Sequence, residues 1–120
     1  MTMTPQALRD RTKKFAVDVV KLAKKIPRDQ TDRLIASQLT RAATGTAAAY
    51  RAACRARSRA DFIYKLGNAI EEADESALWL EILTESDICS PATTAPLWKE
   101  ADELTRIFVG SRETARHSKR

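Results

Sequence analysis

The apolar side chains of this chain recur at the spacing of an α-helix, which limits the folds open to it. Between Leu8 and Ile26 they follow one another at steps of seven, four, three and four residues, so one face of a helix is apolar. Three later stretches repeat the pattern, and no stretch alternates with a period of two for long enough to favour a strand. The expected inward positions are Leu8, Phe15, Val19, Leu22, Ile26, Ile35, Leu39, Ala42, Ala43, Thr46, Tyr50, Ala53, Phe62, Leu66, Ile70, Ala73, Ala77, Leu80, Leu97, Ala101, Leu104 and Phe108.

Capping and helix-breaking residues divide this pattern into four helices. Pro27 disfavours helical geometry at the residue before it, Thr31 and Ser58 are suited to N-caps, and Gly110 is suited to end a helix. We predict helices over about 5–26, 31–56, 58–86 and 94–110, followed by a frayed basic tail over 111–120. Short connections favour antiparallel neighbours, so residues 1–120 are expected to form one all-α domain, an antiparallel up-down-up-down four-helix bundle.

The second helix is unusual because its middle, RAATGTAAAY, consists largely of small residues. Gly45 there costs about 1 kcal/mol relative to alanine unless a close contact repays it. One interpretation is an alanine-rich core helix between bulkier neighbours. The other is that part of this face meets another subunit.

Arginines cluster on the side of the second helix opposite its apolar stripe. Together with a formal net charge of +5, they are compatible with either a solubilising face or a nucleic-acid surface. No aromatic platform for stacking bases is expected, because Tyr50 and Phe62 belong to the core, so such binding would rely on phosphate contacts. The candidate nucleic-acid-binding residues are Arg41, Arg51, Arg55, Arg57 and Arg59.

The third helix carries a second apolar cluster outside its core stripe. Leu78, Trp79 and Ile82 are expected to point outward among glutamates, and exposed apolar clusters rimmed by charge commonly mark an interface. Alternatively, Trp79 packs under the loop at 91–96. Because this patch and the arginines lie on different faces, a contact between them in neighbouring subunits would be heterologous, and repeating it would close a ring.

The sequence offers no catalytic, metal-binding or cofactor-binding constellation, so we expect no enzyme. The one histidine, His117, lies in the predicted tail, and Glu71 with Glu75 on one helix face cannot complete a metal site. Cys54 and Cys89 lack a histidine partner and should lie about 40 Å apart at opposite ends of the third helix, as free thiols. With no long apolar segment and no signal peptide, we expect a cytoplasmic protein without a membrane association.

The stretch QLTRAATGTAAAYRAACRARSRADFIYKLGNAIEEADESALWLEIL, residues 38–83, resembles the small bacterial four-helix-bundle proteins called 23S rRNA-intervening sequence proteins. KKFAVDVVKLAKKIP, residues 13–27, fits the same family. Several separated pieces agree in order: FAVDVV, IP, QLTRAA, RSRADF and EEADESALWLEIL. The second helix departs from the family pattern at Ala49 and over 50–53, where an asparagine and an Ala-Glu-Gly ending are common.

The resemblance implies a homopentamer of four-helix bundles. Relatives include proteins encoded within large-subunit rRNA genes and accessory variability determinant proteins of diversity-generating retroelements. The latter bind nucleic acid and a reverse transcriptase through a basic pentamer surface. Two hypotheses follow: a nucleic-acid-binding accessory protein, or a structural or protein-binding oligomer whose arginines only pair with neighbouring carboxylates.

Overall fold

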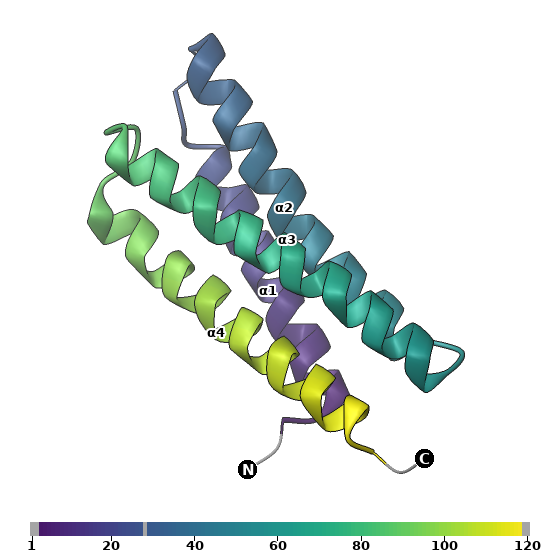
Figure 1. Cartoon of the computed structure of the whole chain (residues 1–120). Coiled ribbons are helices and arrows are strands. Elements are labelled where there is room, and N and C mark those ends of the chain that lie inside the picture. The colour runs from purple at the N-terminus through teal and green to yellow at the C-terminus, as the bar shows by residue number, and fades with distance from the viewer. Residues whose placement is uncertain (1–2, 28, 119–120) are drawn as a thin grey trace.

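The chain folds into four long helices that run alternately up and down (Figure 1). The structure is a computed structural model that describes residues 3–27 and 29–118. The helices are α1 (Pro5–Ala23), α2 (Gln30–Cys54), α3 (Arg59–Glu85) and α4 (Pro91–Arg116), and the described residues include no strand. The start of α1 and the end of α4 lie at the same end of the bundle as the α2–α3 turn, and the other two connections lie at the opposite end. The predicted all-α four-helix fold is confirmed.

Each helix begins at a side chain that accepts a hydrogen bond from its first turn. The hydroxyls of Thr4, Ser58 and Ser90 cap α1, α3 and α4, and Ser58 is the cap that the sequence predicted. The predicted cap of α2 at Thr31 is wrong. The carboxylate of Asp29 caps this helix instead, accepting from the amides of Thr31 and Asp32, and its negative charge suits the positive end of the helix dipole.

The predicted extent of α4 is wrong at both ends. Ser90 caps the helix and Pro91 occupies its first turn, where a missing N–H costs nothing, so α4 begins three residues before the predicted start. Gly110 does not end it, because this glycine has no positive φ and continues as an ordinary helical residue. Residues 111–116 of the predicted tail are therefore helical, while 119–120 lie outside the described residues. The predicted ends of the other helices differ from the observed ones by no more than three residues.

The core follows the predicted apolar stripes. Most predicted inward positions are buried, and Ile35, Phe62, Ile70 and Leu97 are partly buried against the same cluster. Tyr50 stacks on Phe108 with ring centroids 5.4 Å apart, which confirms that Tyr50 is buried. Because this stack joins α2 to α4, the last turns of the two helices lie at the same end of the bundle. The buried positions that the stripes missed are Ala16, Ala36, Ala69, Ser76 and Leu83, with Thr12 and Thr94.

Gly45 provides room for a side chain of α3. A Cβ at this position would lie 1.9 Å from Oε2 of Glu72 and 2.9 Å from its Cδ, distances that no packed structure tolerates. The small residue in α2 thus allows the Glu72 carboxyl group to lie against the helix. The sequence interpretations were an alanine-rich core helix and a contact with another subunit, and neither named this polar contact with α3.

Contacts between consecutive helices are extensive, whereas α1 and α4 contact each other over a much smaller area. A network of ion pairs strengthens this narrow contact. The guanidinium of Arg11 forms two hydrogen bonds with Glu100, of 2.6 and 2.7 Å, and a third with Glu103. Hydrogen bonding to Glu100 raises the pKa of Arg11 further, so the guanidinium is charged at every accessible pH.

Candidate nucleic-acid interface

The turn between α2 and α3 presents three exposed arginines, Arg55, Arg57 and Arg59. Its backbone is held in place by reciprocal hydrogen bonds. The Ser58 hydroxyl accepts from the amide of Asp61, and the Asp61 carboxylate accepts from the amide of Arg57. These bonds fix the backbone that carries the arginines, while their guanidinium groups extend from it.

The last turns of α4 bring more positive charge to the same end of the bundle. Arg112 and Arg116 follow Phe108, whose ring stacks on Tyr50 near the end of α2. The guanidinium of Arg59 donates to the carbonyl of Ser118, just beyond α4. We call this group the basic end; it consists of Arg55, Arg57, Arg59, Arg112 and Arg116.

Two acidic side chains lie close to the basic end, and both already have partners. Asp61 forms a 2.9 Å ion pair with Lys65, which together with the Arg57 amide lowers the pKa of this carboxyl group. Glu113 pairs with Arg116 at 2.9 Å. The other four arginines of the basic end form no ion pair with a carboxylate among the residues that the structure describes.

Arg51, one helical turn before Arg55, lines a groove between α1 and α2. The groove has a volume of about 660 Å³, an apolar floor and positively charged rims. None of its lining residues is acidic. The floor consists of Ala16, Val17, Val20, Ala47 and Ala48, and the rims carry Arg9, Lys13, Lys21, Lys24 and Arg51.

Arg41 is separated from the other predicted arginines. It lies about 15 Å along the helix axis from Arg51, at about 1.5 Å per residue. There it lines a polar hollow between α2 and α3 with Gln38, Glu72 and Glu75. Burial and the neighbouring Glu75 raise the pKa of Glu72, while the charge of Arg41 partly offsets them. Of the five predicted arginines, Arg41 therefore lies apart from the others, and Arg51 joins the α2–α3 turn to the α1–α2 groove.

The three predicted interface residues also differ in their surroundings. Leu78 is 49% exposed and shares a shallow hollow with Ile82, Glu81 and Glu85. Trp79 is partly buried and packs against the core. The exposed tryptophan of this region is Trp98 of α4, whose Nε1 donates a 2.8 Å hydrogen bond to Glu81.

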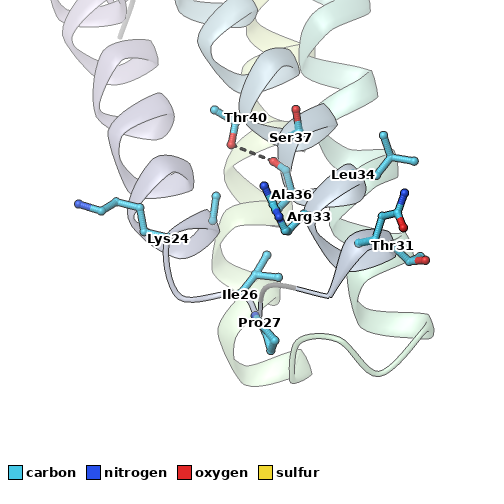
Figure 2. A pocket seen from close by; sticks show the side chains of 11 residues that line it. Lys24, Ile26, Pro27, Thr31, Arg33, Leu34, Ala36, Ser37 and Thr40 are labelled. Atoms are coloured by element: carbon cyan, nitrogen blue, oxygen red, sulfur yellow. Dashed lines mark hydrogen bonds between the residues drawn. The ribbon is translucent and has the colours of Figure 1, made fainter.

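A further hollow surrounds the connection between α1 and α2 (Figure 2). Its polar groups include the hydroxyl of Thr40, which donates to the carbonyl of Ala36 within its own helix. Leu34 at its edge is exposed, and Lys24 lines both this hollow and the α1–α2 groove. Nothing in this hollow resembles a set of converging binding groups.

Several residues of these surfaces were not predicted. Arg112 and Arg116 were assigned to a frayed tail, and only a continuous α4 places them beside the α2–α3 turn. Tyr64 was overlooked as an exposed aromatic: it is 69% exposed, on the second turn of α3. The sequence did contain a signal for the groove, since Val17 and Val20 are apolar residues outside the core stripe of the first helix.

Within residues 3–27 and 29–118, no group of three or more histidine, cysteine, aspartate or glutamate side chains could hold a metal ion. Both cysteines carry free thiols. No helix in the same part of the chain is both long enough and apolar enough to span a bilayer.

The fold and its surfaces define a small antiparallel four-helix-bundle protein with a concentration of arginines at one end. The chain belongs to the 23S rRNA-intervening sequence protein family, whose model matches residues 7–110. It is also similar to the crystal structure of a protein of unknown function from the S23 ribosomal protein family of Bacteroides thetaiotaomicron. That similarity has a TM-score of 0.86 at 30% sequence identity and covers 93% of this chain and 100% of the other. Among curated proteins, none matches this sequence.

Proposed function

We propose that this chain is a non-enzymatic, homo-oligomeric accessory protein that binds single-stranded nucleic acid, RNA or DNA, through its basic end. The observation that carries the proposal is the set of three exposed arginines at the α2–α3 turn, where Arg59 donates to the carbonyl of Ser118 just beyond α4 and so brings the exposed Arg116 to the same end of the bundle. A guanidinium is a permanent charge with a planar array of donors that suits phosphate oxygens. The family description, which refers to an intervening sequence of 23S rRNA, is compatible with such a ligand.

Tyr64 is an exposed aromatic side chain near the basic end, on a side of α3 about 140° around the helix from Arg59. It stands five residues after Arg59, about 7.5 Å along the axis of α3, and its ring is largely exposed. A base stacked on an aromatic ring contributes about 1–3 kcal/mol without regard to sequence. We therefore expect binding that depends on phosphates and stacking, with little sequence preference.

Oligomerisation would multiply a modest charge. One subunit offers few arginines, whereas a ring of subunits in the same orientation, such as a pentamer, presents several basic ends on one side. A ring that neutralises about six phosphates should show a slope of log affinity against log salt near −4 for single strands. A fourfold increase in salt should then weaken binding by a few hundred-fold.

The test is a set of filter-binding titrations with a labelled single strand of mixed sequence at several salt concentrations. We expect Arg55→Gln/Arg57→Gln to weaken binding and to make the salt slope shallower. Lys25→Gln/Lys99→Gln, which removes the same charge from exposed positions elsewhere, should behave as wild type. Undetectable wild-type binding at low salt, or equal effects of the two variants, would exclude the basic end as the site.

A second candidate function, a structural or protein-binding oligomer, is favoured by the exposed apolar side chain of Leu78 beside Ile82 on α3. It predicts an oligomer that purifies with a protein-like ratio of absorbance at 260 and 280 nm. Co-purifying nucleic acid that is removed by high salt would favour the first function.

A further inference from the structure

Charge is segregated along this chain in a way that the basic end does not explain. After Asp32, α2 contains no acidic residue, and after Lys65, α3 contains no basic residue. The outward side of α3 carries the exposed or partly exposed residues Glu71, Asp74, Leu78, Glu81, Ile82 and Glu85. We call this set the acidic face. The Glu81 carboxylate accepts from Trp98, and within the described residues no carboxylate of this face forms an ion pair with a lysine or arginine.

The α1–α2 groove has the opposite character. Its rims are entirely cationic and its floor is apolar, with Val17 43% exposed. Alanines and Thr44 line the α2 side, so the groove is a place where another helix can approach closely. This gives the small residues of α2 a second use beyond the contact of Gly45 with Glu72.

The two surfaces also match in length. The groove extends along α1 from Arg9 to Lys24, about 22 Å at about 1.5 Å per residue, and the acidic face from Glu71 to Glu85 extends about 21 Å. Each surface combines an apolar line with charges of one sign beside it. In such a contact, Val17 and Val20 would cover Leu78 and Ile82. A nucleic acid bound in the groove through its phosphates would leave the two valines without an apolar partner.

We propose that the acidic face of one copy lies in the α1–α2 groove of a second copy. This inference rests on the homo-oligomeric part of the proposed function and names the surfaces that make the contact. Because groove and acidic face belong to different elements of each subunit, the contact is heterologous and can be repeated from copy to copy. It engages Arg51 and leaves the basic end uncovered for nucleic acid.

The test exchanges the charges of the two surfaces. Lys13→Glu/Lys21→Glu reverses two charges of the groove, and Asp74→Lys/Glu85→Lys reverses two charges of the acidic face. All four residues are exposed, and none of them forms a salt bridge within the described residues. Either double variant places like charges opposite each other across the subunit contact. We therefore expect the oligomer of either variant to dissociate at micromolar concentration. The fourfold variant restores opposite charges and the wild-type net charge, and should regain the wild-type mass.

Light scattering gives the mass of each variant, and circular dichroism checks that each remains helical. The control is Lys25→Glu/Lys99→Glu, which makes the same change in net charge as the groove variant but at exposed positions elsewhere. This variant should keep the wild-type mass. A wild-type monomer, a pair reversal that leaves the mass unchanged, or a folded fourfold variant that stays dissociated would overturn the proposal.

Nucleic-acid binding separates this proposal from the proposed function. If the groove variant keeps the wild-type mass but loses binding to the labelled strand, the groove holds nucleic acid and the inferred contact is wrong. If the fourfold variant regains its mass but neither it nor wild type binds the strand, the contact holds and the proposed function fails.

Discussion

The carboxyl group of Glu72 on α3 occupies the space in which a Cβ at Gly45 on α2 would lie. This pairing explains why a helix would keep a glycine in its interior at a cost of about 1 kcal/mol. Sequence reasoning identified Gly45 as a place of close approach but expected apolar packing. The polar contact could not be predicted, because it depends on the register between two helices, which helical periodicity alone does not fix.

Replacing Gly45 tests this pairing. In a Glu72→Ala background, Gly45→Ala should raise the free energy of unfolding by about 1 kcal/mol through helix propensity. In the wild-type background the gain should be smaller, because the Glu72 side chain must move away from the new Cβ. Urea unfolding of the two single variants and the double variant gives the coupling. The same gain in both backgrounds would show that Glu72 does not lie against Gly45.

The carboxyl group of Glu72 should also make stability depend on pH. Burial and then Glu75 raise its pKa above the ordinary value, so the folded chain holds this proton more tightly than the unfolded chain. Its contribution is fully present below the unfolded pKa and is lost as pH rises through the higher folded pKa. As the pH rises from about 4 to about 7, a range that includes ordinary carboxyl titration, we expect the free energy of unfolding to fall less for Glu72→Gln than for wild type.

Urea unfolding at a series of pH values measures this difference, with Asp10→Asn on the exposed side of α1 as the control. Parallel profiles for wild type and Glu72→Gln would contradict the assignment.

At the scale of elements, the helices were predictable because their apolar spacing and caps are local properties. The stripes predicted most of the core, and Ser58 was correctly identified as the start of α3. The start of α4 was misplaced because Pro91 and Pro96 suggest a loop, yet a proline in the first turn is compatible with a helix. Its end was misplaced because Gly110 lowers helix propensity without preventing helix formation.

The cap of α3 supports a direct measurement. Ser58→Ala removes the acceptor for the amide of Asp61, and we expect a loss of about 1 kcal/mol in the free energy of unfolding. Ser58→Asp keeps an acceptor and should stay close to wild type. Thermal unfolding followed by circular dichroism compares the two, and equal losses would mean that the hydroxyl contributes nothing to the start of the helix.

At the scale of the whole molecule, the sequence indicated the kinds of surface but not their composition. It identified arginines near the second turn and apolar groups on the third helix, and the structure brings three of those arginines together with Arg112 and Arg116. Arg41 faces α3 and Arg51 borders the α1–α2 groove, positions that the helical wheel could not give because it describes one helix, whereas each surface is built by two. Trp79 was placed outward by the same wheel but is partly buried against the core.

The narrow contact between α1 and α4 has a consequence for the order in which the chain can fold during synthesis. All the extensive contacts join helices that are consecutive in the chain, so each hairpin can form as soon as its second helix has emerged from the ribosome. Only the closing contact, through Arg11 and Glu100, joins the first helix to the last and must wait for nearly the whole chain. Until α4 emerges, the carboxylates that bind Arg11 are absent, so the ion pairs that close the bundle can form only near the end of synthesis.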